Sequence, residues 1–321
     1  MILAIGNSGI HEVDAFKAVA ESLQRRGCDR VVLFKQDKCL EGEYFNCDAS
    51  NSRFAYSVTI DGKQYNVEDF SAVWYLKPHL PRELMTYEPA KYRQLLQRQF
   101  QEMRQAVWTI FSHKKWVNDP WQELKVDNKA FQLNLAVQTG FKIPDTLITS
   151  DPERVRNFFN AHNEDVIFKL LAASPIQDEV MYTNRLTRDF LKNIERIKSS
   201  PTIFQAYVPK AYELRITIAG DKIFPAKIYS QDDSGTALDW RRRPKLNDFE
   251  AKMEITELPL HIEQSIRSFM LAAKLDFGCF DMIVTPDGEY VFLEINPSGQ
   301  WYFVQLRTEA KIGEAVADLL V

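Results

Sequence analysis

Residues 278–299 read GCFDMIVTPDGEYVFLEINPSG, two apolar runs on either side of the turn Thr285–Gly288. β-Branched and aromatic residues fill both runs, and the turn has Pro and Asp at its centre and Gly at its end. This pattern is typical of a β-hairpin. The hairpin is the starting point for interpreting the whole chain, because its polar residues are unusual for strands of this composition.

Three polar side chains interrupt the apolar pattern of the hairpin. If the first and last residues of the turn pair, Asp281 lies opposite Phe292, on the face that also carries Glu294 and Asn296. A one-residue bulge at Gly288 would change this register.

Two carboxylates and a carboxamide in otherwise apolar strands are costly to bury unless something binds them. Hard oxygen ligands of this kind suit Mg²⁺, which usually takes one or two carboxylates and completes its shell with substrate phosphates. A hairpin with a polar outer face is the alternative. That alternative does not explain why Pro297 and Gly299 follow the polar residues directly.

Length and composition indicate a globular protein of two or three structural units. The net charge of −4 gives no global basic field for binding nucleic acid. No apolar run is long enough to span a bilayer, and residues 1–6 lack the cationic start and longer apolar run of a signal peptide. The four cysteines show no CxxC spacing, so we expect buried or free thiols in a reducing cytoplasm.

Residues 1–118 predict an α/β unit, to which we assign support and partner binding. A βαβ pattern opens this unit, and Asp61-Gly62 marks a hairpin between two later strands. The expected elements are strands at 2–5, 31–34, 54–60, 63–67 and 72–76, and helices at 11–26 and about 89–111.

A boundary is expected at Asn118–Pro120, and a helix after it. Asp127 can cap a helix that runs to Thr139. Lys129 then lies in the first turn, where free backbone N–H groups favour an anion. A single lysine at such a place is also commonly solvated, so its role is open on this evidence alone.

Lys169 lies in the apolar run Val166–Leu171, which predicts a buried strand. A charge in such a strand usually has a partner. A nucleotide phosphate is the natural partner here.

The strand near Thr202–Val208 ends in a non-helical linker, whose backbone groups can pair with an adenine edge. Glu213 and Arg215 share a face of the next strand. The carboxylate could accept ribose hydroxyls and the guanidinium could clamp a phosphoryl or carboxylate group, with a cross-strand salt bridge as the alternative. Arg241 belongs to an arginine-rich cluster at 239–243, which either steers an acidic substrate or forms an exposed loop.

The order of these features resembles the ATP-grasp superfamily: a lysine at a helix start, a lysine in a buried strand, a hinge, Glu-x-Arg, an Asp strand and a Glu-x-Asn strand. More narrowly, the chain resembles the graspetide (microviridin-type) peptide macrocyclases over essentially its whole length, most strongly from Asp127 onward. The motifs that carry the resemblance are AVWY (72–75), PKAYELRITI (209–218), DWR (239–241), FDMIVTPD (280–287) and FLEINP (292–297).

The resemblance implies an α/β (α+β) ATP-grasp fold in three parts. These are an N-terminal α/β pre-ATP-grasp domain (1–118), a central ATP-grasp subdomain with a leader-peptide-binding region (119–200), and a C-terminal ATP-grasp subdomain with the Mg/ATP site (201–321). The stretch Asp178–Leu186 resembles the hairpin that receives a leader peptide. Leu76-Lys77 departs from the family, because paired arginines are expected there.

The resemblance also implies a role for each candidate residue, with ATP and Mg²⁺ as cofactors. Ala206 stands where related hinges often carry Glu, so its adenine contact would come from the backbone. The implied roles are ATP phosphate contacts by Lys129 and Lys169, adenine binding by Gln205, Ala206 and Val208, ribose binding by Glu213, Mg²⁺ binding by Asp281, Glu294 and Asn296, and contact with the reacting carboxylate and its phosphoryl group by Arg215 and Arg241.

The implied activity is ATP-dependent activation of a side-chain carboxylate in a ribosomally made precursor peptide. The peptide carries a leader and an acidic, hydroxyl-rich core, and its acyl phosphate closes an intramolecular ester or amide ring. The alternative is an ATP-grasp ligase that adds free amino acids to a peptide or protein, and a further one is a nucleotide-regulated peptide-binding module. We expect a cytoplasmic protein without nucleic-acid or membrane partners, and homodimerisation is left open.

Overall fold

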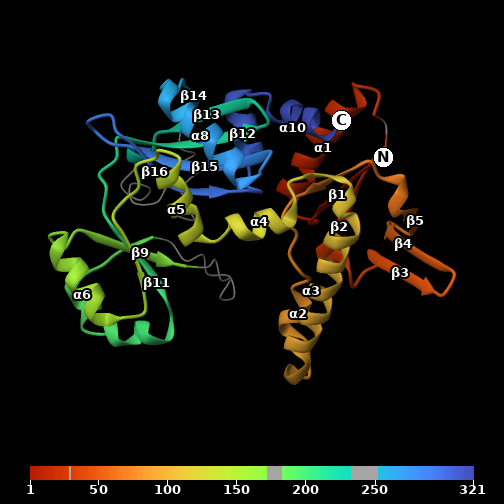
Figure 1. Cartoon of the computed structure of the whole chain (residues 1–321), viewed down its shortest axis with the longest axis horizontal. Helices are drawn as coiled ribbons and strands as arrows, with labels where there is room; N and C mark the ends of the chain where they lie inside the picture. The colour runs from red at the N-terminus through yellow and green to blue at the C-terminus, as the bar shows by residue number, and fades with distance from the viewer. Residues whose placement is uncertain (29, 172–182, 233–251) are drawn as a thin grey trace.

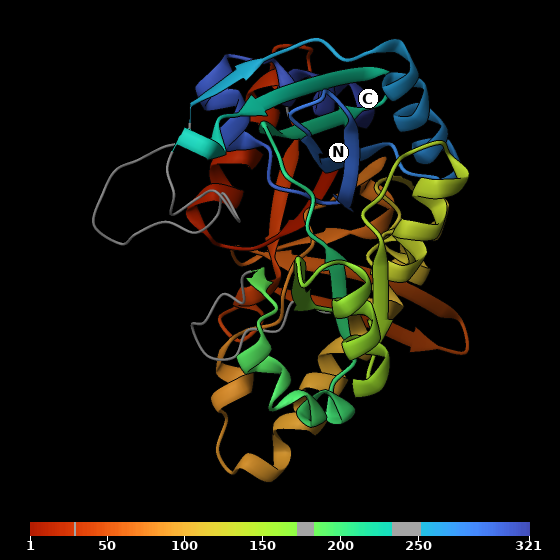
Figure 2. The ribbon, with the colours of Figure 1, turned by 90° about the vertical axis from the view of Figure 1, so that its left-hand side faces the viewer.

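The computed structural model describes residues 1–28, 30–171, 183–232 and 252–321 (Figure 1). Four sheets are present in these ranges. In both views the central sheet with β9 and β11 lies beneath the C-terminal sheet with β12 and β15 (Figures 1 and 2). None of the helices in the described ranges combines the length and the apolarity needed to cross a membrane.

The N-terminal unit contains the predicted βαβ arrangement. Its main sheet has the order β2-β1-β6-β7 and is parallel throughout. A second, antiparallel sheet has the order β3-β4-β5, and its β4–β5 turn is the predicted Asp61-Gly62 hairpin. The elements are β1 (Ile2–Gly6), α1 (Ile10–Gln24), β2 (Val31–Lys35), β3 (Tyr44–Ser50), β4 (Arg53–Ile60), β5 (Lys63–Asn66), β6 (Ala72–Tyr75), α2 (Glu83–Thr86), α3 (Arg93–Ile110) and β7 (Lys115–Val117).

The central part is a small antiparallel sheet of order β10-β9-β11-β8 with helices beside it. Two helices, α4 and α5, precede it. The elements are α4 (Pro120–Val126), α5 (Lys129–Gln138), β8 (Thr146–Thr149), α6 (Pro152–Ala161), β9 (Val166–Leu170), β10 (Asn184–Arg185), α7 (Arg188–Leu191) and β11 (Thr202–Ala206).

The C-terminal sheet is antiparallel, with the order β14-β13-β12-β15-β16. Its elements and the helices that follow are β12 (Tyr212–Ala219), β13 (Lys222–Ile228), β14 (Met253–Ile255), α8 (Leu260–Ala273), β15 (Phe277–Val284), β16 (Tyr290–Asn296), α9 (Tyr302–Thr308) and α10 (Ile312–Leu320). The mixed α/β class predicted from the sequence is confirmed, while the predicted domain boundaries remain predictions.

Two hydrophobic clusters pack against opposite faces of the C-terminal sheet. Phe280 and Phe292 belong to the cluster shared with α5 and α8. Ala219 and Cys279, on the other face, belong to the cluster shared with α1 and α10. Asp281 continues this second face, because side chains two residues apart on a strand point the same way. The predicted metal ligand therefore lies just beyond the apolar cover of the sheet.

The β15–β16 hairpin is present, but its predicted register is wrong. Thr285 pairs with Glu289 rather than with Gly288, and its N–H donates to the Glu289 carbonyl oxygen at 2.9 Å. Gly288 adopts the left-handed conformation, with φ +87°. A three-residue hairpin loop commonly ends on such a glycine. The extra loop residue shifts the pairing by one.

A second irregularity lies between Asp281 and Met282. Met282 pairs with Phe292, whereas Asp281 pairs with Glu294, so Leu293 is an extra residue in β16. Strict alternation would place Phe292 and Glu294 on one face. The bulge instead lets Phe292 enter the core, where it is fully buried, while Glu294 stands directly opposite Asp281.

The N-cap of α5 also differs from the prediction. Asp127 ends α4, and its N–H donates to the Glu123 carbonyl oxygen at 2.8 Å. Asn128 caps α5 instead, because its side chain accepts a hydrogen bond from the Phe131 N–H at 3.0 Å. Lys129 is thus the first residue of α5 and lies in its first turn, as predicted.

The left-handed turn residue gives a testable prediction. Gly288→Ala should lower the free energy of unfolding by about 1 kcal/mol, because a Cβ is strained at positive φ. Among the described residues other than Gly288 and its two chain neighbours, no heavy atom lies within 4 Å of that Cβ position, so the cost is conformational. Gly288→Asn should cost less, since Asn tolerates this conformation. Urea denaturation measures both, and equal midpoints for Gly288→Ala and wild type would contradict the turn geometry.

Candidate nucleotide and metal site

A row of charged side chains crosses three neighbouring strands of the C-terminal sheet. Arg215 of β12 pairs in register with Asp281 of β15, and Asp281 pairs with Glu294 of β16. Residues directly opposite each other on adjacent strands project from the same face. The three side chains therefore form one line across the sheet.

Arg215 is the most constrained member of this row, being 6% exposed. Its Nη1 donates to both Asp281 carboxylate oxygens, at 2.9 and 2.8 Å, and its Nη2 donates to the Gln300 carbonyl oxygen at 2.8 Å. The cross-strand salt bridge considered from the sequence is therefore formed. Arg215 Nε is buried without a hydrogen-bond partner among the described residues, so the guanidinium keeps one donor for a ligand.

The predicted metal ligands form one network. Asn296 Nδ2 donates to Asp281 Oδ2 at 3.0 Å and to Glu294 Oε1 at 3.4 Å. Lys129 Nζ, from the start of α5, lies 2.6 Å from Glu294 Oε2. The two carboxylates are thus neutralised by Arg215 on one side and by Lys129 on the other.

The donor set fits Mg²⁺. Two carboxylates and a carboxamide provide hard oxygen atoms within one small area. The described residues contain no group of three or more His, Cys, Asp or Glu side chains that could hold a metal. A magnesium ion at Asp281, Glu294 and Asn296 would therefore complete its shell with water or phosphate oxygens, which is the usual arrangement for this ion.

The central sheet places Lys169 and Gln205 on one face. Ile203 pairs with Lys169 and Gln205 pairs with Ile167, so these side chains alternate away from the buried Phe204. Gln205 Nε2 donates to Thr146 Oγ1 at 2.9 Å, whereas its buried Oε1 has no partner in the described ranges. This unsatisfied acceptor fits an amino-group donor such as the adenine edge, because buried polar atoms are normally paired.

The hinge backbone is only partly open to a ligand. The Ala206 N–H donates to the Asp145 carbonyl oxygen at 2.9 Å, and the Tyr207 N–H donates to the Asp165 carbonyl oxygen at 2.9 Å. An adenine contact from Ala206 would therefore use its carbonyl oxygen. Val208 lies two residues further along the non-helical linker that joins β11 to β12.

Glu213 shares the face of Arg215 and is also buried. Lys210 Nζ lies 2.5 Å from Glu213 Oε1, and both side chains are at most 10% exposed. Burial raises the pKa of Glu213, while Lys210 and a hydrogen bond from Ser230 oppose this shift. The lysine thus favours the ionised carboxylate, the form that accepts hydroxyl hydrogens.

Two predicted features cannot be placed. Arg241 lies outside the described residues, and so does most of the stretch Asp178–Leu186. The described end of that stretch contains β10, which pairs with β9. For the other candidates, the structure brings Lys129, Arg215 and the three predicted metal ligands together, and it places Lys169 and Gln205 on the neighbouring central sheet.

The sequence did not predict a second cluster of polar residues, which lies next to the end of the hairpin. Asn118, Glu123 and Ser298 lie in hydrogen-bond contact, and Asn118 and Glu123 are 2% and 3% exposed. In the sequence, Asn118 marks only a boundary, and Ser298 belongs only to the Pro-Ser-Gly end of the hairpin. A buried glutamate in the amphipathic α4 leaves no local signal, because its partners come from distant parts of the chain.

Burial raises the pKa of Glu123 to about 8, against hydrogen bonds from Ser298 and Asn118 that lower it. Lys77, which follows β6, lowers this pKa as well, and Asp127 raises it. Glu123 therefore carries a proton at neutral pH, as buried carboxyl groups do when their environment cannot stabilise a charge.

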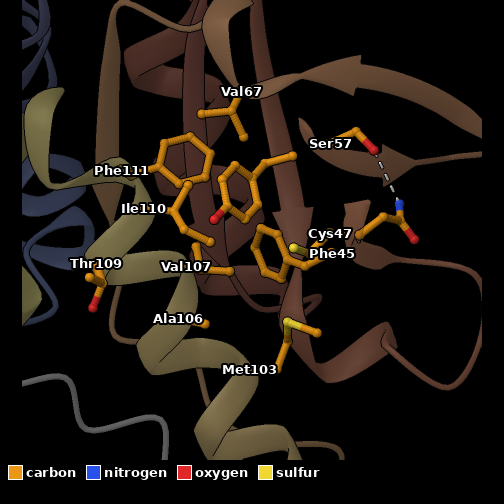
Figure 3. Close-up of a pocket in the computed structure, with 12 residues that line it drawn as sticks. Phe45, Cys47, Ser57, Val67, Met103, Ala106, Val107, Thr109, Ile110 and Phe111 are labelled. Atoms are coloured by element: carbon orange, nitrogen blue, oxygen red, sulfur yellow. Dashed lines mark hydrogen bonds between the residues drawn. The ribbon is translucent and has the colours of Figure 1, made fainter. Parts of the chain in front are cut away.

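An apolar hollow lies elsewhere, in the N-terminal unit (Figure 3). It has a volume of about 390 Å³ between β3, β4 and α3, and Phe45, Tyr56, Met103 and Val107 line it. Its lining residues include no carboxylate and no cation. This hollow therefore does not contribute to the charged site on the C-terminal sheet.

Known proteins share the fold that carries this site. No protein-family model matches the sequence. Macrocyclase MdnC of Microcystis aeruginosa MRC, bound with precursor peptide MdnA, superposes with a TM-score of 0.86 at 28% identity, over 99% of this chain and 98% of that one. The chain has the ATP-grasp fold of these peptide macrocyclases.

Two further comparisons agree with this fold. A RiPP-associated ATP-grasp ligase of Chryseobacterium gregarium, in complex with ADP and a leader and core peptide, gives a TM-score of 0.84 at 27% identity, over 99% of this chain and 96% of that one. The α-aminoadipate–LysW ligase LysX of Sulfurisphaera tokodaii is 25% identical over 202 residues, 59% of this chain and 66% of LysX. The macrocyclase resemblance is confirmed, and the comparisons support a ligase enzyme.

Glu123 gives a pH prediction. Its pKa is raised on folding, so the unfolded chain releases this proton at lower pH than the folded chain does. Stability should therefore fall as pH rises from about 4.5 to about 8, by roughly 4 kcal/mol from this group. Glu123→Gln removes this titration. Urea unfolding at several pH values should show a flatter pH dependence for the variant, and parallel curves would contradict a raised pKa.

Proposed function

We propose that this ATP-grasp protein activates a side-chain carboxylate of a precursor peptide with ATP and closes intramolecular ester or amide rings. The row of Arg215, Asp281 and Glu294, with Asn296 and Lys129 attached, is the observation that carries the proposal. In this row, oxygen atoms that can bind a cation lie beside cationic side chains that can bind an anion. Solved structures of the same fold hold precursor peptides or a leader and core peptide, and several of them also hold ADP.

Each candidate residue has a role in this proposal. Bound Mg²⁺ supplies charge neutralisation of the phosphates, held by Asp281, Glu294 and Asn296. The remaining binding roles are phosphate contacts for Lys129 and Lys169, adenine contacts for Gln205, Ala206 and Val208, and ribose contact for Glu213. Gln205 Oε1 and Arg215 Nε have no hydrogen-bond partner within the described part of the chain, and this supports ligand binding at both ends of the nucleotide.

The chemistry needs no nucleophile from the protein. A peptide carboxylate oxygen attacks the γ-phosphorus of ATP, the bond to the β-phosphate oxygen breaks, and ADP leaves. A hydroxyl or amine of the same peptide then attacks the acyl carbon and loses a proton as phosphate departs. Arg215, and Arg241 by the family resemblance, would hold the carboxylate and the transferred phosphoryl group in place.

A ligase that adds a free amino acid is the second candidate. The similarity to LysX favours it, since that relative is named as a ligase of α-aminoadipate and LysW. The coverage and similarity of the macrocyclase structures are higher, so we rank ring closure first. We further propose a cytoplasmic protein whose partner is a peptide with a leader and an acidic, hydroxyl-rich core. Homodimerisation is also part of this proposal.

The product mass tests this function. Incubation of a cognate precursor peptide with Mg-ATP should release ADP and phosphate and yield a peptide lighter by one water per linkage. An amino-acid ligase would give a heavier peptide, and a binding module would change no mass. Mild alkaline hydrolysis should then restore the lost water, because we expect esters rather than amides. Residue addition in intact-mass spectra would overturn ring closure and favour the second candidate.

The metal ligands give a second test. Asp281→Asn should reduce turnover by about 100-fold or more, because it removes a ligand charge and half of the Arg215 pair. Asp287→Asn is a matched control, since Asp287 is exposed in the turn of the same hairpin. ADP release measures both variants, and circular dichroism checks the fold. Wild-type turnover in Asp281→Asn would remove the proposed Mg²⁺ site.

A further inference from the structure

Asn118 ties the N-terminal unit to both strands of the hairpin. Its Nδ2 donates to the carbonyl oxygens of Phe277 and Pro297, both at 2.9 Å, and to Glu123 Oε1 at 3.2 Å. Its Oδ1 accepts from the backbone N–H groups of Asp276 and Phe277, each at 2.9 Å. One buried carboxamide therefore holds the start of β15 beside the end of β16.

Ser298 extends this contact towards the site. Its hydroxyl donates to Glu123 Oε1, the oxygen that also accepts from Asn118. It also lies 3.5 Å from the carbonyl oxygen of Tyr75 in β6. We call Asn118, Glu123 and Ser298 the junction cluster, because they join the N-terminal unit to the residues that follow β16.

The turn after Ser298 packs directly on the catalytic arginine. A Cβ at Gly299 would lie 2.8 Å from Arg215 Nη2 and 2.6 Å from the Cys279 Cβ, so only glycine fits there. The next residue, Gln300, accepts the hydrogen bond from Arg215 Nη2 at 2.8 Å. Only Gly299 thus separates the Ser298 anchor from Gln300, whose carbonyl oxygen orients the guanidinium.

We infer that the junction cluster positions Arg215: Asn118, Glu123 and Ser298 fix the turn whose Gln300 carbonyl oxygen sets the direction of the guanidinium. Asp281 alone holds Nη1 through both oxygens and leaves the group free to tilt about that contact. The Gln300 carbonyl oxygen removes this freedom and aims Nε. Asn118, the last residue of the N-terminal unit, therefore contributes to the geometry of the site together with Glu123 of α4, beyond the support that the sequence of this unit suggested.

A measurement on Arg215 itself tests this inference without any activity. In ¹⁵N-arginine-labelled protein, the Nε–H signal of Arg215 is assigned by its loss in Arg215→Lys. Ser298→Ala should shift or broaden this signal. Ser265→Ala is the matched control, because Ser265 is a buried serine of α8 outside the site, and it should leave the signal unchanged. An unmoved Arg215 signal in Ser298→Ala would overturn the inference.

Kinetics provide the second test, which rests on the proposed function. Ser298→Ala should lower kcat by about tenfold with KM for ATP changed by less than about twofold, since it misdirects a group that acts on the reacting atoms. In the Arg215→Lys background the same change should cost less than about twofold. Equal losses in both backgrounds would show a general structural effect and reject the positioning role. A wild-type protein that releases no ADP would refute the proposed function but leave the NMR result to decide the inference.

Discussion

The ion pair between Arg215 and Asp281 is the constraint on which the site depends. A buried guanidinium is tolerated only when its charge is matched and hydrogen bonds replace most of its contacts with water, because desolvation of a charge is expensive. Here a bidentate contact to Asp281 and a carbonyl oxygen from Gln300 meet that need. The strand order then has little freedom, since β12 must pair with β15 in the register that places these two residues opposite each other.

The bulge at Leu293 reconciles this charged row with the hydrophobic core. Phe280 and Phe292 must enter the same cluster, while Asp281 and Glu294 must face the site. Regular alternation cannot meet both demands along β16, because Phe292 and Glu294 are two residues apart. The extra residue Leu293 changes the alternation, so that Phe292 faces the core and Glu294 faces the site. The irregular strand is thus the consequence of a core and a site that share one hairpin.

The difference between local patterns and long-range contacts explains which residues the sequence could predict. Asp281, Glu294 and Asn296 were found because polar residues in apolar strands are conspicuous locally, and Lys169 for the same reason. The predicted register was wrong because it depends on the three-residue loop that ends at Gly288 and on the bulge at Leu293, and the local pattern specifies neither. The pairing of Lys129 with Glu294 and the contacts of Asn118 with Phe277 and Pro297 join residues more than 150 positions apart. Only the folded chain brings those partners together, so Glu123 and Ser298 gave no signal.

The ion pairs of the site would affect how a metal ion and a nucleotide bind there. Lys129 and Arg215 neutralise the same carboxylates that suit a metal ion. A dication that binds Glu294 must therefore compete with Lys129, which lies 2.6 Å from it. A nucleotide phosphate offers Lys129 another anion, and the start of α5 adds free backbone N–H groups on the same side. If the proposed roles hold, binding of a phosphate to Lys129 would free Glu294 for the metal, and the two ligands would favour each other through a single lysine.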